Sequence, residues 1–294
     1  MKRAAVAFAA AIAMMVMAVA PAAAITKNYE PDSEHTFVGL IGFYDQAWTW
    51  QHRCTGELIA PTVVLTAGHC TDDGSGGHLA QARIWFEQNA GAQFDGVQDP
   101  VTGYPNTCLE PAFCREADVM FNYGFNNFAG FPNTHDVGIV ILREPITTLG
   151  YGHLAHAGAL DSLNSAKGVQ DKDFRVSGYG ISFSAKRGAV AVSYRVRLQA
   201  VEQLVNTVNQ NTDGYNIQLN GNGDDRGGTC SGDSGGPVFY AQDSWRIVAV
   251  TSFGHTNAGC RGDGFYYRLD RAEVIAWILS VSGSDAAFIR ANIE

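Results

Sequence analysis

The segment Thr229–Pro237, with the sequence TCSGDSGGP, is the most informative stretch of the chain. It places Ser234 on a short loop between glycines, which let the backbone turn tightly and let a substrate carbonyl approach closely. A serine hydroxyl is a weak nucleophile at neutral pH, so it needs a base to accept its proton and amide groups to hold the developing oxyanion. The segment therefore predicts that the rest of the chain supplies a histidine and a carboxylate.

Two further motifs supply these groups. The histidine, His69, lies in the segment LTAGHC at residues 65–70, directly after an apolar run that is typical of a buried strand. The carboxylate is Asp136, in HDVGIVIL at residues 135–142, and it opens another apolar run. A partly buried carboxylate needs hydrogen-bond donors, and the N–H of the His69 ring would meet that need and fix the tautomer of the ring.

The serine segment also satisfies the pattern G-x-S-x-G, which marks the nucleophile of α/β-hydrolases. That fold requires a helix after the serine and a triad in the order serine, acid, histidine. Here the residues after Pro237, Val238-Phe239-Tyr240, favour a strand, and only a short tail remains to supply an acid and a histidine. We therefore reject this alternative.

The three motifs, in the order histidine, aspartate, serine, resemble those of the chymotrypsin/trypsin-like serine peptidases, and we expect a secreted, bacterial-type member. The resemblance covers about residues 25 to 282 and extends to TSFG at residues 251–254, which is similar to the substrate-binding strand of that family. It implies an all-β fold of two antiparallel six-stranded β-barrels with a C-terminal α-helix. The first barrel would cover about residues 25–150 and the second about residues 170–282.

The resemblance also implies the role of each catalytic residue. Ser234 would attack the scissile carbonyl, His69 would accept its proton, and Asp136 would orient His69. The N–H groups of Gly232 and Ser234 would form the oxyanion hole. The substrate-binding residues would be Gly228 at the base of the specificity pocket, Gly254 and Gly264 on its walls, and Ser252, which would also support Asp136.

The glycine at the base of the pocket predicts which substrate side chains the pocket accepts. An open, uncharged pocket favours large apolar or aromatic side chains at P1, the substrate residue before the cleaved bond. Asp263, which is next to Gly264, would instead recruit Arg or Lys if its carboxylate reached into the pocket.

The N-terminus is typical of a secretion signal over residues 1–24. Basic residues at positions 2 and 3 precede an apolar run over residues 4–20, and small residues at 21–24 offer a cleavage site. An uncleaved membrane anchor is the alternative, but the run is just short of a spanning length. Cleavage before Ile25 would leave a peptidase domain of residues 25–294, whereas cleavage after Ala22 would leave two extra residues.

Cleavage before Ile25 would also activate the enzyme, if the resemblance holds. The freed ammonium of Ile25 would form an ion pair with Asp233, and this pair would order the oxyanion loop and the pocket. Lys27 and Asn28 depart from the glycines that are usual after the activating residue.

The six cysteines fit an exported protein, because disulfides form in oxidising compartments. Spacing alone cannot choose among the pairings. The resemblance implies Cys54–Cys70 and Cys230–Cys260, which leaves Cys108–Cys114 as a small loop closure. A zinc site is the alternative, but the sequence has no Cys-x-x-Cys or matching histidine pair, so we expect neither a metal nor a cofactor.

Composition limits the partners. The net charge of −9 argues against nucleic acid and, after removal of the signal, against a membrane surface. We expect polypeptide substrates, protein protease inhibitors as further partners, an extracellular location and a monomeric state. A catalytically silent binding module on the same fold is the alternative function, but such proteins usually lack a triad residue and this chain has all three.

Short strand signals recur between turns and favour an all-β barrel architecture. They cover residues 37–44, 63–67, 83–87, 138–142, 174–179, 190–198, 215–219, 245–253 and 264–269, and helical periodicity is clear only at 271–281, where Asp270 can cap the helix. The segment Gln88–Asn133 is longer than is usual between the histidine and aspartate motifs. We interpret it either as an inserted loop that shapes access to the cleft or as a bland solvated insertion.

Overall fold

The computed structural model describes residues 25–74, 77–93, 103–104, 108, 114–163, 172–183, 191–192, 195–240, 245–254, 260 and 262–294. The predicted leader, residues 1–24, lies outside the described residues. Within these ranges, no helix is both long enough and apolar enough to cross a membrane.

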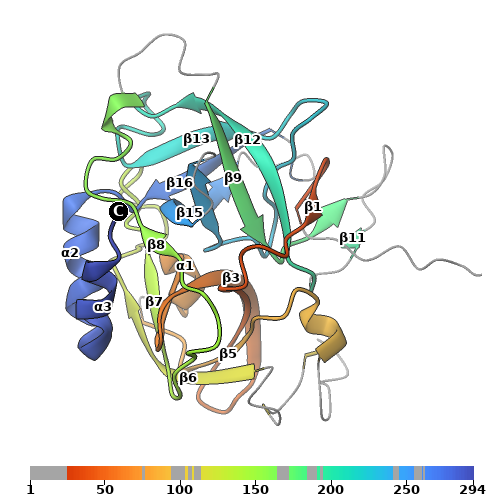
Figure 1. The fold of residues 1–294 in the computed structure, drawn as a ribbon, viewed down its shortest axis with the longest axis vertical. Coiled ribbons are helices and arrows are strands. Elements are labelled where there is room, and N and C mark those ends of the chain that lie inside the picture. The colour runs from red at the N-terminus through yellow and green to blue at the C-terminus, as the bar shows by residue number, and fades with distance from the viewer. Residues whose placement is uncertain are drawn as a thin grey trace, which may run out of the picture.

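The first half of the chain forms a closed antiparallel barrel (Figure 1). Its strands are β2 (Val38–Tyr44), β3 (Trp50–Ala60), β4 (Val63–Thr66), β5 (Gln81–Trp85), β6 (Cys114–Asn122) and β7 (Gly138–Leu142). They close in the order β2-β3-β4-β7-β6-β5. Branched and aromatic side chains suit a pleated, buried surface; every residue of β2 and β4 is buried, and most of their apolar side chains belong to the first hydrophobic core.

The second half forms another six-stranded antiparallel barrel. Its strands are β9 (Asp173–Gly178), β12 (Leu198–Asn206), β13 (Asn216–Asn220), β14 (Pro237–Tyr240), β15 (Arg246–Gly254) and β16 (Asp263–Arg268). They follow the order β12-β13-β16-β15-β14-β9, and the pairing of β9 with β12 closes the barrel. Figure 1 shows the two barrels one above the other, so residues at their seam can come from both halves of the chain.

Shorter elements join and flank the barrels. The strands are β1 (Glu30–Pro31), which pairs with β12, β8 (His153–Leu154), which runs parallel to β15, and the ribbon of β10 (Ser182–Phe183) and β11 (Ala191–Val192). The helices are α1 (Gly68–Thr71), α2 (Ala272–Val281) and α3 (Ala286–Ala291), with single 3₁₀ turns at Ala90–Gln93, Asp161–Leu163 and Gly283–Asp285. Helices α2 and α3 lie together at one edge of the molecule (Figure 1).

The structure confirms the two-barrel fold and the C-terminal helix, but three of the barrel strands differ from the expectation. Strand β6 lies inside the segment Gln88–Asn133, which is therefore not an insertion along its whole length; its Arg, Glu and Asp residues mask the alternation of a strand. Strand β12 begins at the residue where the predicted strand 190–198 ends. Strand β3, which carries His, Arg and Glu side chains among apolar ones, gave no strand signal.

The predicted cap at Asp270 is wrong. Helix α2 begins at Ala272 after Arg271, which occupies the N-cap position without a side-chain hydrogen bond. The Asp270 carboxylate instead accepts hydrogen bonds from the Arg268 guanidinium at 2.7 and 2.8 Å and from the Leu160 N–H at 2.8 Å. A guanidinium binds the carboxylate more strongly than a helix N–H does, because the donor and the acceptor of that hydrogen bond are both charged.

Candidate active site

His69 lies on α1, directly after the buried strand β4. A Cβ at the preceding residue, Gly68, would lie 2.9 Å from Phe125 and 3.1 Å from the backbone of Val137, so only glycine lets the helix approach β7 this closely. The Cys54–Cys70 disulfide ties the helix to β3 on its other side. The His69 side chain is 25% exposed and therefore stays accessible to a substrate.

Asp136 holds His69 through both the ring and the backbone. The ring Nδ1 lies 2.9 Å from Oδ2 and 3.1 Å from Oδ1 of Asp136, and the backbone N–H of His69 donates to Oδ1 at 2.7 Å. The hydroxyl of Ser252 donates a short hydrogen bond to Oδ2. Because an ionised carboxylate only accepts, Nδ1 carries the proton and Nε2 is left to accept one.

The electrostatic effects on the two residues reinforce each other. Burial alone would raise the pKa of the Asp136 carboxyl, but the charge of His69 and hydrogen bonds from His69 and Ser252 bring it below 3.8. Burial lowers the pKa of the His69 ring, but Asp136 and, more weakly, Asp72 raise it above 6.5. The arrangement therefore favours the cationic ring that forms when His69 accepts a proton.

The loop that carries Ser234 depends on glycines with positive φ. Gly232 has a φ of 100° and Gly235 a φ of 78°, which other residues rarely adopt. A Cβ at Gly235 would also collide with Oγ1 of Thr66. Two backbone hydrogen bonds close the loop, from Asp233 N–H to Cys230 at 3.0 Å and from Gly236 N–H to Asp233 at 2.8 Å.

Thr55, on β3, fastens this loop to the first barrel. Its N–H donates to the Ser234 carbonyl at 2.8 Å, and its hydroxyl donates to the Gly232 carbonyl at 2.8 Å. The same hydroxyl accepts from the Tyr179 N–H at 3.0 Å, and the Thr55 carbonyl accepts from the Thr66 hydroxyl at 2.8 Å. Sequence reasoning missed Thr55, because a single threonine in an unrecognised strand carries no motif.

The serine loop comes close to the histidine helix. The Ser234 carbonyl oxygen lies 3.6 Å from Sγ of Cys70, the residue after His69. Among the described residues, however, no hydrogen bond joins the Ser234 hydroxyl to His69, so that contact stays a prediction. Catalytic hydrogen bonds often tighten only in the substrate complex.

The predicted oxyanion donors remain available. The N–H groups of Gly232 and Ser234 donate to no other residue among those described. Unpaired N–H groups on a glycine-rich turn are what an oxyanion would need, and each such donor contributes roughly 3 kcal/mol in comparable enzymes. Their part in an oxyanion hole is a prediction that the loop geometry supports.

Asp233 is fully buried under the same loop. Its carboxylate accepts from the Gly180 N–H at 2.7 Å and the Cys230 N–H at 2.8 Å. Burial raises its pKa to about 7, although the two N–H donors act in the opposite direction. Ile25 is buried in the core of the second barrel, and its carbonyl accepts from the Ser182 hydroxyl at 2.7 Å. The ion pair between Ile25 and Asp233 remains a prediction, because the chain continues through residue 24.

The glycines of the expected specificity pocket lie at the end of the second barrel. Gly254 and Gly264 are direct neighbours across β15 and β16. Gly228 pairs with Thr26 through two backbone hydrogen bonds of 2.8 and 2.9 Å. A Cβ at Gly228 would make ordinary van der Waals contacts, the nearest with Gly221 and Thr26 at 3.7 Å, so it would fit without a collision.

Asp263, which could have made this pocket acidic, is held by another strand. Its carboxylate accepts hydrogen bonds from the side-chain amides of Gln218 and Asn220 on β13, each at 2.6 Å. Both oxygens are thus engaged on the β13 side of β16. Asp263 therefore adds negative potential near the pocket rather than a free carboxylate.

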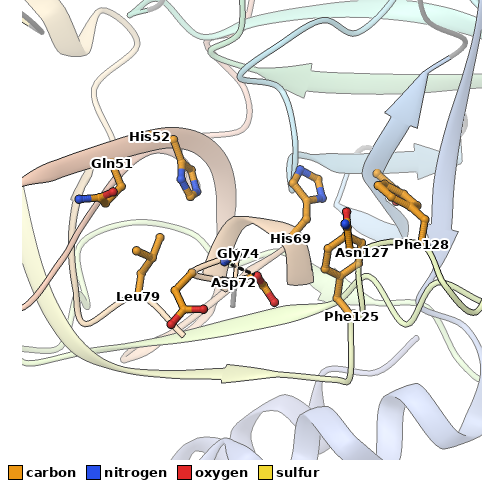
Figure 2. A pocket seen from close by; sticks show the side chains of 11 residues that line it. Gln51, His52, His69, Asp72, Gly74, Leu79, Phe125, Asn127 and Phe128 are labelled. Atoms are coloured by element: carbon orange, nitrogen blue, oxygen red, sulfur yellow. Dashed lines mark hydrogen bonds between the residues drawn. The ribbon is translucent and has the colours of Figure 1, made fainter. Parts of the chain in front are cut away.

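A cavity of about 540 Å³ lies beside His69. Figure 2 shows Phe125, Asn127 and Phe128 on one side of His69, and other lining residues from β3 and the loop after α1 on the opposite side. The Phe125 and Phe128 rings pack edge to face, with centroids 5.0 Å apart, and the Phe125 ring lies 5.8 Å from the His69 ring. These aromatic residues belong to the segment Gln88–Asn133, so the part of it after β6 does lie at the site.

All three predicted disulfides are present. They join Cys54 to Cys70, Cys108 to Cys114 and Cys230 to Cys260. Cys54, Cys70 and His69 lie close enough together to suggest a metal site, but both sulfurs are used in a disulfide. No thiolate is therefore available there for a metal.

Comparison with known proteins identifies the family. The family model described as Trypsin matches residues 30–278, so the chain belongs to the trypsin family. Among curated relatives, CLIP domain-containing serine protease HP8 of Bombyx mori is 27% identical over 84% of this chain and 66% of its own length. Chymotrypsin-C of Bos taurus is 25% identical over 70% of this chain and 69% of its own length.

The relatives qualify this assignment in two ways. The chain spans only 14% of the ovochymase of Halocynthia roretzi, to which it is 22% identical over 80% of its own length, and 59% of phenoloxidase-activating enzyme 1 of Spodoptera litura. These relatives are animal proteins, so they give no support to the expectation of a bacterial-type member.

Two solved structures show the same fold. The structure titled HL collagenase matches with a TM-score of 0.58 at 17% identity, over 85% of this chain and 94% of that chain. Human heparin binding protein matches with a TM-score of 0.55 at 18% identity, over 87% of this chain and 94% of that chain. At these identities the likeness concerns the fold alone.

Proposed function

We propose that this chain is a secreted serine endopeptidase that hydrolyses peptide bonds through an acyl-enzyme, with His69, Asp136 and Ser234 as its triad. The observation that carries the proposal is the paired ring and carboxylate of His69 and Asp136, with the Ser234 loop fastened beside them by Thr55. Export is supported by the apolar leader and by the three disulfides.

The residues act in a fixed order in this mechanism. His69 Nε2 accepts the proton as the Ser234 hydroxyl attacks the scissile carbonyl, and Asp136 stabilises the cationic ring. The N–H groups of Gly232 and Ser234 receive the oxyanion. His69 then donates its proton to the leaving amine, and a water molecule releases the acyl group by the same steps in reverse.

A substitution of the nucleophile tests the proposal. Ser234→Ala should lower kcat for casein by about 10⁶-fold while the far-UV circular dichroism stays unchanged. Ser231→Ala is the matched control, since Ser231 is exposed on the same loop and should keep its activity. A folded wild-type protein that reacts with no fluorophosphonate probe would favour the catalytically silent binding module instead.

We further propose that removal of residues 1–24 creates the activating terminus at Ile25. The buried position of Ile25 and the absence of an ion pair at Asp233 among the described residues support this proposal. Breaking a buried amine–carboxylate pair from one side costs about 3–5 kcal/mol, so Asp233→Asn should lose most of the activity. A form with one extra alanine before Ile25 should lose it as well, and full activity of that form would show that Asp233 needs no ammonium.

A further inference from the structure

A buried carboxyl group lies directly behind the expected specificity pocket. Glu202 is on β12, is only 1% exposed, and faces the interior of the second barrel. Its Oε1 accepts from the Tyr266 hydroxyl at 2.6 Å and from the Thr229 N–H at 3.2 Å. Thr229 follows Gly228, the expected base of the pocket, so Glu202 is one hydrogen bond away from the pocket floor.

The same carboxyl group is linked to a wall of the pocket. The Tyr266 hydroxyl lies against Gly264, because a Cβ at Gly264 would collide with it. This hydroxyl is also 2.9 Å from Oγ1 of Thr229. Glu202, Tyr266 and Thr229 therefore form one hydrogen-bonded group under the wall and the floor that a P1 side chain would reach.

Within the described part of the chain, nothing neutralises Glu202. It forms no ion pair there, and its Oε2 has no hydrogen-bond partner. Burial raises the pKa of Glu202 to about 8; the charges of Asp233 and Asp263 add to this effect, and the hydrogen bonds to Oε1 oppose it. The floor of the pocket thus has three acidic groups around it, and the positive charge of Arg53 acts on one of them, Asp233.

The fold itself does not require an acid at this position. Glutamine has the same shape, and its carbonyl oxygen could accept both hydrogen bonds that Oε1 of Glu202 accepts. A buried carboxyl that lacks a counter-charge is costlier than its neutral isostere. The carboxyl group of Glu202 also lies one hydrogen bond from the expected pocket floor, where a positive charge that arrives from outside can meet it.

We propose that Glu202 is a specificity-determining residue of the pocket and that it selects substrates whose P1 side chain ends in a positive charge, as in Arg or Lys. This inference rests on the proposed peptidase function. It replaces the expectation of large apolar or aromatic P1 side chains, which rested on the uncharged Gly228 and the glycine walls of the pocket. The arriving cation displaces the proton of Glu202, so binding and deprotonation are coupled.

Other titratable groups face Glu202, and their effects on the pH dependence of binding must be distinguished from the effect of Glu202. They are Tyr266 and Asp263 on β16 and Asp233 under the serine loop. His69 is a further titratable group of the same site, and Asp136 raises the pKa of its ring against the effect of burial. A comparison of Glu202→Gln with the parent protein isolates the contribution of Glu202, because the substitution leaves the other four groups in place.

Calorimetry with benzamidinium, an aromatic cation, tests the proposal without catalysis. The folded, processed Ser234→Ala protein is titrated at pH 7 in two buffers that differ in ionisation enthalpy. We expect close to one proton released per cation bound, and an affinity that rises at least about tenfold from pH 6 to pH 9. Adding Glu202→Gln should abolish most of both effects, while Glu144→Gln, at an exposed position, should change neither.

Two outcomes of this experiment would overturn the proposal. One is a benzamidinium affinity that does not change between pH 6 and pH 9 in the protein with Glu202 present, a result that does not depend on whether Glu202→Gln folds. The other is equal proton release with Glu202 and with Gln at this position. Neutral benzamide should release no proton in any variant, which controls for effects of occupancy alone.

Kinetics separate failure of this inference from failure of the proposed function. We expect wild-type kcat/KM to be higher for Arg anilides than for Leu anilides, by a ratio that rises with pH and falls at least about tenfold in Glu202→Gln. Hydrolysis of Leu substrates with no effect of Glu202→Gln would overturn the inference alone. Proton-linked benzamidinium binding without hydrolysis of any substrate would overturn the peptidase function alone.

Discussion

Asp32 and Glu202 are both buried acidic residues, but they differ in the groups that surround them. Asp32 is fully buried and accepts hydrogen bonds from the ring and the N–H of His35 and from the Ser177 hydroxyl. The guanidinium of Arg197 lies 3.8 Å away. Glu202 is equally buried and has neutral donors only.

The pKa values of the two groups diverge for this reason. Burial alone would raise the pKa of Asp32, but the hydrogen bond and charge of His35, followed by Arg197 and Ser177, lower it to about 2. Burial raises the pKa of Glu202 to about 8, because its donors are too weak to compensate. The comparison shows that this chain supplies a counter-charge to one buried acid and not to another. Glu57, whose fully buried carboxylate has no hydrogen-bond partner among the described residues, is similar to Glu202 in this respect.

The largest change in the free energy of unfolding should come from substitution of Asp32, the buried acid that has a counter-charge. Asp32→Asn leaves the Arg197 guanidinium buried without its carboxylate, so the free energy of unfolding in urea at pH 7 should fall by about 3–5 kcal/mol. The wild-type contribution is present above pH 3.8 and is lost as pH falls towards 2, so the deficit of the variant should shrink in that range. Asp118→Asn, which breaks an exposed ion pair with Arg143, should cost less than about 1 kcal/mol. Equal effects of the two substitutions would remove the contrast.

A smaller effect of opposite sign is expected at the pocket. The folded protein holds the proton of Glu202 up to about pH 8, whereas the unfolded chain releases it near pH 4.5, so stability declines as pH rises between these values. Glu202→Gln removes this decline and should raise the free energy of unfolding at pH 8 by at least about 1 kcal/mol, with little change at pH 4. Destabilisation at pH 8 in urea titrations would mean that Glu202 is compensated after all.

The smallest effect concerns the network around Arg197. The Tyr179 hydroxyl donates to the Glu87 carbonyl at 2.6 Å and accepts from Arg197 at 3.2 Å. Tyr179→Phe should therefore lower the free energy of unfolding by about 1 kcal/mol, and kcat/KM should not change. A loss as large as that of Asp32→Asn would show that the hydroxyl, rather than the charges, holds this region together.

The sequence predicts the fold and the pairing of His69 with Asp136 because their signals are local. His69, Asp136 and Ser252 lie in short motifs, and the structure brings them together as expected. The glycines of the serine loop follow from the same motif, since positive φ angles require them. The disulfide pairings were predicted from the family resemblance, which itself rests on these motifs.

Glu202 could not be found in this way, because its role depends on the register of β12. The segment Leu198–Asn206 mixes polar and apolar residues without a clear period of two, and a shift by one residue would turn Glu202 to the outside of the barrel. Thr55 was missed for a related reason, since strand β3 was not recognised. Both residues act through contacts between segments that are far apart in the sequence.

Thr55 has a consequence for how the molecule could be divided. This residue of the first barrel makes hydrogen bonds to the Ser234 loop of the second barrel, so neither half alone would hold the proposed triad in place. On the proposed function, two fragments that each bear one barrel would be inactive when apart and would hydrolyse substrate only after reassociation. The fold is thus a natural starting point for a split reporter, in which proteolysis signals that two fused partners have met.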